Sequence, residues 1–192
     1  MSRASVLPVS FLSWLCASLL SVSALLCLTP PARAASASEL STDAMAALEQ
    51  LYAQEPRMRE LGRKAVGVLV FPSIIKGGLL VGGERGDGAL IRRGKVEAFY
   101  SISALSFGFQ AGAQQFSYAL FFMNEPAMAY LDQSDGWSLG AGPSLVVVDQ
   151  GYAASITTTT VTQDVYAVPF GEQGLMAGMG LEGSKISRMD LN

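Results

Sequence analysis

The residues best placed to do chemistry in this sequence are basic side chains gathered in one part of the chain. Of thirteen Lys and Arg residues, nine fall between residues 57 and 95, although the whole chain has sixteen acids and a formal net charge of −3. A basic stretch in an acidic protein predicts a local surface that faces anions. The alternative is that these bases pair with the acidic remainder of the chain. The candidates for anion binding are Arg57, Arg59, Arg63, Lys64 and Lys76, with Arg92 and Arg93 in second rank.

The sequence offers little for catalysis. It contains no histidine, and its two cysteines, Cys16 and Cys27, lie in the N-terminal apolar segment. Ser-His-Asp and Cys-His catalysis and His-ligated zinc or haem are therefore excluded. The carboxylates are scattered without a catalytic spacing. We expect no catalytic residue, no metal and no cofactor; an enzyme that acts on lipids or glycans through two carboxylates is the third-ranked alternative.

The glycines between residues 77 and 88 do not form a phosphate-binding motif. They match neither G-x-x-x-x-G-K-[ST] nor G-x-G-x-x-G between a strand and a helix. The segment from Asp132 to Asp135 lacks the spacing of an EF-hand. Hairpin turns and close backbone packing explain the glycines better, and no nucleic-acid partner is expected.

The N-terminus has the pattern of a secretory signal peptide. Arg3 is followed by a mostly apolar segment at 6–28, by Pro30-Pro31, and by the small-residue site Ala32-Arg33-Ala34. We expect a signal peptide over residues 1–34 and export to the periplasm or envelope of a Gram-negative-type bacterium. The alternative is an uncleaved membrane anchor, because the apolar segment is nearly long enough to span a bilayer.

Helices are predicted mainly in the N-terminal part of the remaining chain. Ser41 or Thr42 is expected to cap a helix that runs from Asp43 to about Gln54, with an apolar stripe of Met45, Leu48, Leu51 and Tyr52. Pro56 should begin a second helix, from Arg57 to about Lys64, which either lies on a membrane or packs its apolar stripe on the domain. A short internal helix should follow Asn124 as its cap.

The rest of the chain predicts many short strands. In the segment 65–88, Pro72 is expected to halt a first strand, and residues 82–88 are expected to be turns. Further strands are expected at 89–92, 95–100, 106–111, 115–123, 137–148 with a kink at 140–143, 153–160, 161–168, 175–181 and 185–189. We predict an α+β fold that is predominantly antiparallel β, sandwich or barrel-like, with N-terminal helices and one short internal helix. A helical segment at 35–64 and a β-rich part at 65–192 should form one domain.

Several motifs resemble one known family. They are GVLVFP at 67–72, Lys76-Gly77-Gly78, GGERGDG at 82–88, FGFQAGAQ at 107–114, GAGP at 140–143, QGLMAG at 173–178 and LEGS at 181–184. In this order they resemble the SYLF domain, a lipid-binding family that in eukaryotes is also called Las17-binding and actin-regulatory. The resemblance covers roughly Leu48 to the C-terminus.

The resemblance implies binding of anionic phospholipids through the basic part of the chain. Its lipid-binding candidates are then the seven basic residues given above. Where many members have a tryptophan-serine-x-proline segment, this chain has Phe99-Tyr100-Ser101-Ile102, and it ends at Asn192 without an aromatic extension. Actin binding is therefore not expected. The expectation is a non-enzymatic, exported, lipid-binding module; the alternative is a structural envelope protein that binds protein partners through a glycine-rich strand edge.

Overall fold

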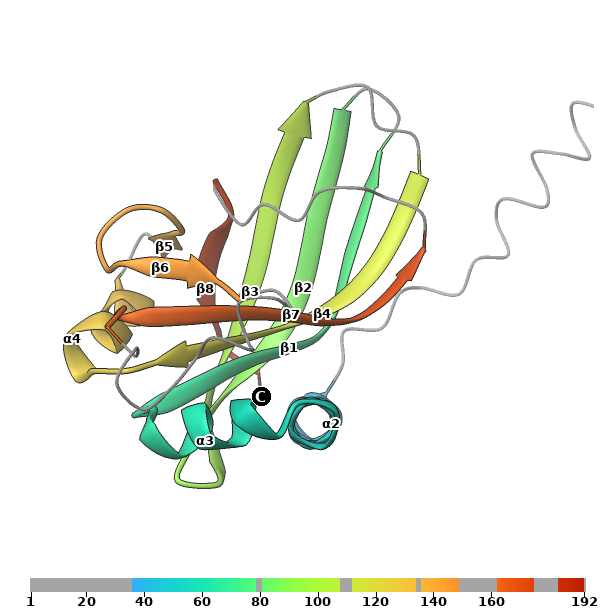
Figure 1. Cartoon of the computed structure of the whole chain (residues 1–192). Coiled ribbons are helices and arrows are strands. Elements are labelled where there is room, and N and C mark those ends of the chain that lie inside the picture. Colours follow the sequence, from blue (N-terminus) through green and yellow to red (C-terminus); the bar gives the residue numbers. More distant parts are fainter. Residues whose placement is uncertain are drawn as a thin grey trace, which may run out of the picture. The chain divides into compact units, whose positions relative to one another are not determined.

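The computed structural model describes residues 36–78, 81–107, 112–133, 136–148, 162–174 and 183–191. Over these residues eight strands form one sheet that curls into a half-barrel (Figure 1). The strands are β1 (Gly67–Gly78), β2 (Val81–Arg92), β3 (Lys95–Phe107), β4 (Gly112–Phe122), β5 (Trp137–Ser138), β6 (Leu145–Val147), β7 (Val165–Gly174) and β8 (Lys185–Met189). The predicted signal peptide and the predicted strands at 153–160 and 175–181 lie outside the described residues.

The sheet is almost entirely antiparallel. Its order is β5-β8-β3-β2-β1-β4-β7-β6, and of the neighbouring pairs described only β6 and β7 run parallel. The prediction of an α+β fold with a predominantly antiparallel sheet is confirmed, and the barrel-like arrangement is the one adopted.

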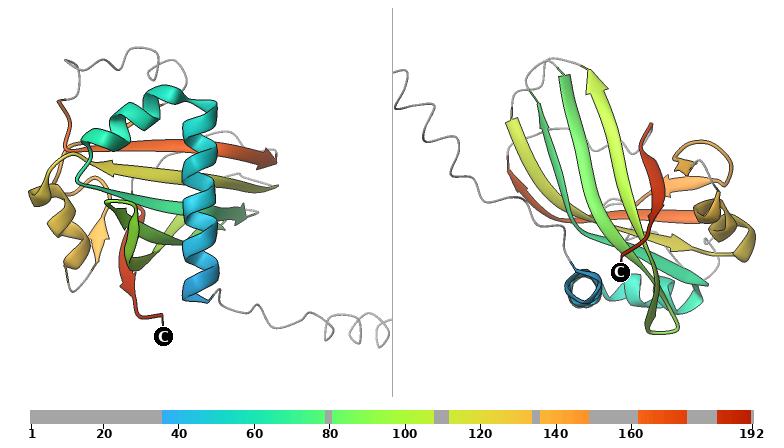
Figure 2. Two further views of the ribbon diagram at one scale, coloured as in Figure 1. Left: turned by 90° about the horizontal axis from the view of Figure 1, so that it is seen from below. Right: turned by 180° about the vertical axis from the view of Figure 1, so that it is seen from behind.

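Helices cover both faces of the sheet. On one face lie α2 (Ala37–Gln54), which crosses the strands, and α3 (Pro56–Lys64), as Figure 2 shows. Leu51 and Leu61 of these helices pack with Phe121 in one apolar cluster. On the other face, α4 (Glu125–Met128) and the 3-10 helix η2 (Ala129–Asp132) contribute to a second cluster with Phe122 and Trp137. The half-barrel therefore has a helix-covered outer face and an inner face closed partly by α4 and η2.

Side-chain caps mark the starts of α2 and α4. The predicted start of α2 is wrong, because the helix begins at Ala37 with Ser36 as its N-cap. Ser36 and Glu39 form a reciprocal capping box: the Glu39 backbone N–H donates to Ser36 Oγ (3.3 Å), and the Ser36 N–H donates to Glu39 Oε2 (2.9 Å). The cap at Asn124 is confirmed, since its Oδ1 accepts a hydrogen bond from the Ala127 N–H at 2.8 Å.

The predicted break at Pro72 and the predicted turns at 82–88 are both wrong. β1 continues through Pro72, where a register shift between Val70 and Ser73 marks a bulge. A proline fits a central strand at a bulge because it has no N–H to give to the ladder. Residues 82–88 lie in β2, paired with strands on both sides. Gly86 and Gly88 of this segment allow close packing: a Cβ at Gly88 would lie 2.7 Å from the Val70 carbonyl oxygen and 2.5 Å from the Phe71 ring.

Other strand bounds also differ from the prediction. The segment expected at 95–100 and residues 106–107 of the segment expected at 106–111 belong to one long strand, β3, and residues 108–111 lie outside the described residues. The segment expected at 137–148 is divided into β5 and β6 by the predicted kink, where Gly140 and Gly142 have φ values of 97° and 93°. The turn at Arg93-Gly94 between β2 and β3 is confirmed.

Candidate functional site

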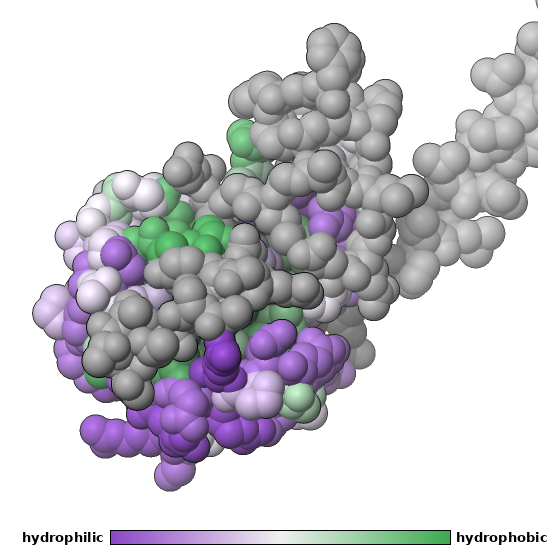
Figure 3. All heavy atoms as spheres, viewed as in Figure 1, coloured by the Kyte–Doolittle hydropathy of each residue, from purple (hydrophilic) through white to green (hydrophobic). Residues whose placement is uncertain are grey.

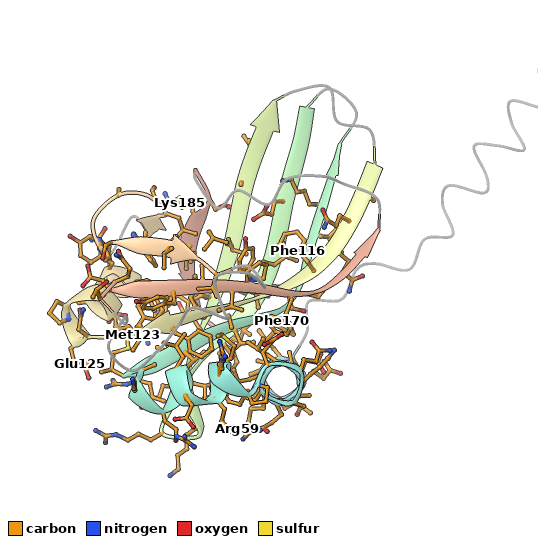
Figure 4. The ribbon with its side chains drawn as sticks, viewed as in Figure 1. Arg59, Phe116, Met123, Glu125, Phe170 and Lys185 are labelled. Carbon is orange, nitrogen blue, oxygen red and sulfur yellow. The ribbon has the colours of Figure 1, made fainter. Side chains whose placement is uncertain are left out.

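The structure brings two separate basic segments to one end of the protein. Helix α3 carries Arg57, Arg59, Arg63 and Lys64, all exposed, and the β2–β3 hairpin carries Arg92 and Arg93. We call these six residues the basic end. Figure 3 shows a largely hydrophilic surface at this end, and in Figure 4 Arg59 lies there beside α2 and α3, whereas Lys185 lies on β8 away from it.

A groove of about 540 Å³ opens where α2, α3 and the β2–β3 hairpin meet. We call it the helix–hairpin groove. It is lined by Met45, Leu48, Glu49, Tyr52, Gly62, Arg63, Ala65, Val66, Gly67, Val68, Ile91, Arg92, Arg93, Gly94 and Glu125. Its lining therefore combines apolar side chains from α2 and the sheet with three of the six residues of the basic end.

Tyr52 is fixed against α3 by a glycine. A Cβ on Gly62 would lie 2.0 Å from the Tyr52 hydroxyl oxygen, so no larger residue fits there without moving the ring. Burial, followed by the negative charge of Glu49, raises the pKa of Tyr52 to about 12, although the Arg59 charge opposes this. The phenol is therefore neutral at physiological pH and remains a hydrogen-bond donor.

Two of the arginines on α3 already contact carboxylates. Arg59 pairs with Glu49 of α2 at 2.9 Å, and its guanidinium carbon lies 4.9 Å from the centre of the Tyr52 ring. Arg63 pairs with Glu60 one turn earlier on α3. These pairs are exposed, so each contributes about 0–1 kcal/mol and is readily exchanged for another anion. The sequence alternative in which the bases pair with acids is thus realised for these two residues.

Arg92 holds the hairpin to its surroundings. Its Nε donates to the Val66 carbonyl oxygen at 3.2 Å, and its terminal nitrogens lie 2.7 Å from Glu125 Oε1 and 3.5 Å from Glu97 Oε2. Only 23% of the Arg92 side chain is exposed. This arginine connects β2 to the start of β1 and to α4, and its first role is structural.

Arg93 is placed differently from its neighbour. It occupies the hairpin turn with a φ of 49°, the only positive φ at a non-glycine residue in the described part of the chain. It is exposed and forms no ion pair with any residue that the structure describes. Among the seven predicted residues it is the one whose charge is least compensated by the protein.

Lys76 does not lie with the other six candidates. It is only 8% exposed and sits on the inner face of the sheet, opposite Glu84 on β2 and Gln114 on β4. Burial raises the pKa of Glu84, while the Lys76 charge and a hydrogen bond from the Ser184 hydroxyl lower it. The Oε1 atom of Gln114 is buried and has no hydrogen-bond partner among the described residues.

Sequence reasoning missed the part that α2 plays in the site. Met45, Leu48, Leu51 and Tyr52 were expected as one apolar stripe, but only Leu48 and Leu51 are buried. Met45 is 44% exposed, and both Met45 and Tyr52 line the groove. The sequence signal for the groove was this apolar stripe, because packing on the sheet buries only part of it.

Two further kinds of feature are absent from the described residues. No group of three or more acidic or cysteine side chains there is arranged to hold a metal ion. Neither α2 nor any other helix in the described ranges is long and apolar enough to cross a bilayer.

The sequence was also compared with known proteins. Residues 103–192 match the family model described as Ysc84, a Las17-binding protein actin regulator. The chain matches none of the curated proteins with which it was compared. The matched segment begins within β3, so the glycine-rich strands β1 and β2 and the whole basic end precede it.

Proposed function

We propose that the protein is a non-enzymatic module that docks on anionic phospholipid headgroups through its basic end, because residues 103–192 match the SYLF (Ysc84) family model. Membership of this family is consistent with a lipid-binding or interaction module.

The observation that supports docking is the convergence of α3 with the β2–β3 turn. Residues separated by a complete hairpin in sequence share one end of the protein and enclose the mouth of one groove. A basic side chain close to an anionic membrane contributes about 1 kcal/mol of binding free energy. Because Glu49, Glu60, Glu97 and Glu125 lie among the bases, the net attraction is smaller than the sum over six residues.

Charge reversal tests the docking surface. The double variant Arg63→Glu/Arg93→Glu places two negative charges at the basic end, and it should lose most co-sedimentation with vesicles that contain phosphatidylglycerol. The matched control is Arg85→Glu/Lys185→Glu, two exposed residues outside the basic end. Arg85 lies eight residues from Arg93 along β2, about 25 Å away in an extended strand. The control should bind as the parent does.

Two results would contradict docking through the basic end. One is equal co-sedimentation with anionic vesicles and with pure phosphatidylcholine vesicles. The other is equal loss of binding in the double variant and in its control. Binding should also weaken as salt is raised, because exposed charges more than about 8 Å apart are screened at physiological ionic strength.

Export is the second part of the proposal. The pattern at residues 1–34 supports secretion to a periplasmic or envelope location, with a mature chain that begins at Ala35. The intact mass of the protein recovered from the envelope fraction tests it. A mass that includes residues 1–34 would favour the retained anchor, and recovery from the cytoplasm would contradict export.

An envelope protein that binds protein partners is the alternative, and two exposed side chains favour it. Ile75 and Leu105 are 62% and 77% exposed on β1 and β3. The glycine-rich strands lie in the middle of the sheet, however, whereas the two outermost described strands, β5 and β6, have two and three residues. Assembly through a glycine-rich edge is therefore not supported. Light scattering after size exclusion separates the alternatives, because an oligomer indifferent to lipid would favour protein partners.

A further inference from the structure

We propose that the helix–hairpin groove binds the acyl chain of a single anionic amphiphile whose phosphate is held at the groove mouth by Arg63 and Arg93. This inference rests on the proposed function and extends it from docking on a surface to binding one lipid molecule. It depends on three properties of the groove: its size, its apolar walls and the position of its uncompensated charge.

The size of the groove is that of a small-molecule site. Its volume of about 540 Å³ lies within the usual range of ligand pockets, roughly 300–1,000 Å³. It extends between α2 on one side and the β2–β3 hairpin on the other. A flat electrostatic contact with headgroups needs no such depth, so the groove is a separate feature from the charge around it.

The walls of the groove are aliphatic and aromatic. Met45, Leu48 and Tyr52 line it from α2, and Val66, Val68 and Ile91 line it from β1, its approach and β2. Met45 is 44% exposed although it is a large apolar residue. A methylene chain in the groove would remove apolar surface from water on both sides of the contact, and each buried methylene group contributes to binding.

The charge at the mouth selects an anionic head. Glu49 is committed to Arg59 and Glu125 to Arg92, so the two acids that line the groove are already neutralised. Arg93 has no carboxylate partner among the described residues, and the partner of Arg63 is an exposed neighbour on its own helix. A phosphate monoester presents several acceptor oxygens to two such guanidinium groups. Tyr52 adds a neutral hydroxyl donor to the same lining.

The occupant follows from this combination. An acidic peptide would suit the arginines but would not require an apolar groove behind them, and a neutral chain would leave Arg93 without its counter-ion. A phosphorylated single-chain amphiphile satisfies both requirements. Its phosphate replaces the contact of Arg63 with Glu60, which is weak because it is exposed.

Calorimetry with the mature chain and monomeric lysophosphatidic acids, held below their micelle-forming concentration, tests the inference. We expect one molecule bound per chain. Lengthening the acyl chain by two methylene groups should tighten binding about tenfold until the groove is filled. Glycerol 3-phosphate, which has the same head and no chain, should bind far more weakly. Lysophosphatidylcholine of matched length, which has no net charge, should also bind more weakly.

Two variants separate the chain from the head. Met45→Trp fills the groove and should weaken binding of lysophosphatidic acid at least tenfold without changing vesicle docking. The control Gln50→Trp adds the same side chain at an exposed α2 position outside the groove and should have no effect. Arg93→Asn, which keeps Arg63, should weaken the preference for the phosphate head while it leaves the dependence on chain length intact.

The experiments distinguish failure of the groove inference from failure of docking through the basic end. If vesicles bind and monomeric lysophosphatidic acid does not, or if affinity is independent of chain length, the groove inference is overturned and docking stands. If neither ligand binds, both proposals fail together. If the mature chain is a dimer that Met45→Trp dissociates while Gln50→Trp does not, the groove is occupied by a second copy of the chain, and the inference is wrong.

Discussion

Lys76 and Glu84 lie opposite each other on β1 and β2, and each is more than nine-tenths buried, at 8% and 7% exposure. The attraction between two opposite charges in this position offsets part of the free-energy cost of burying each of them. The charge of Lys76 lowers the pKa of Glu84, but burial raises it by more. The sequence grouped Lys76 with the lipid-binding bases. In the structure its side chain is buried on the inner face of the half-barrel, opposite Glu84 and Gln114.

Removing one member of this pair should be costly. Lys76→Met leaves the Glu84 carboxylate without its nearby positive charge and should lower the free energy of unfolding by about 3–5 kcal/mol. The double variant Lys76→Met/Glu84→Leu leaves no charge and should recover most of that loss. Urea denaturation of the parent, both single variants and the double variant measures the coupling. Additive effects would show that the two charges do not depend on each other.

The pH dependence of stability should follow the raised pKa of Glu84. The folded state binds the Glu84 proton more tightly than the unfolded state does, whose pKa is close to the ordinary value of 4.5. This group therefore favours folding most at pH values below 4.5, and that contribution is lost as pH rises through the folded-state pKa. In Lys76→Met the folded-state pKa should rise further and the loss should extend to higher pH. Denaturation midpoints measured across the pH range give this pH dependence of stability. Glu84→Gln is the reference, because glutamine has no titratable carboxyl group. An unchanged profile in Lys76→Met would contradict the expectation.

Replacing Gly88 should destabilise the fold because β2 approaches the bulge in β1 closely at this residue. A Cβ there would lie 2.7 Å from the Val70 carbonyl oxygen, and backbone cannot move aside as a side chain can. Gly88→Ala should lower the free energy of unfolding by about 1–3 kcal/mol, the usual range for overpacking. Gly83→Ala is the matched control in the same strand, since its Cβ would meet only the Ala104 carbonyl oxygen at 3.8 Å. Equal melting temperatures for the two variants would refute this explanation of the glycines.

The pKa of Asp164 is shifted in the opposite direction from the pKa of Glu84. Its carboxylate accepts hydrogen bonds from the Ser144 N–H (2.9 Å), the Ser144 hydroxyl (2.8 Å) and the Asn124 amide (2.8 Å). These bonds, with the Ser144 N–H as the largest contribution, lower the pKa of Asp164 below its ordinary value of 3.8. The stability that they give is present above pH 3.8 and lost as pH falls through the lowered pKa. Carbon-detected NMR titration should place the pKa of Asp164 below 3.8 in the parent and somewhat closer to 3.8 in Ser144→Ala, which removes the hydroxyl bond and keeps the backbone N–H. Equal values in the two proteins would exclude the Ser144 hydroxyl as a contributor.

The regular elements were the predictable part of this fold. Pro56 at the first turn and Asn124 as a cap act through contacts within a few residues, so the sequence carries them locally. The course of β1 through Pro72 was not predictable in this way. It depends on β2 and β4 on either side and on the Ser117 hydroxyl, which donates to the Pro72 carbonyl oxygen at 2.8 Å from 45 residues away.

The candidate site shows the same division. The basic composition of residues 57–95 identified six residues that the fold does gather at one end. Composition does not determine which face of a strand a side chain occupies, and that is why Lys76 was grouped with them. Nor does it reveal that a cavity forms between α2 and a hairpin that follows it by some 40 residues in sequence. Nor does composition reveal that Tyr52, which lines this groove, lies against α3 in the space that Gly62 leaves.

Adjacent arginines in the hairpin should respond oppositely to neutralisation. Arg92 donates to the Val66 carbonyl oxygen and pairs with Glu125, so Arg92→Ala leaves both groups without this partner and should lower the free energy of unfolding by about 1–3 kcal/mol. Arg93→Asn should leave stability unchanged or slightly raised, because asparagine tolerates the φ of 49° at this position. The same substitution removes a charge from the basic end and should weaken binding to anionic vesicles about fivefold. Thermal denaturation and vesicle co-sedimentation of both variants provide the comparison. A destabilised Arg93→Asn with normal vesicle binding would assign Arg93 a structural role and remove it from the docking surface.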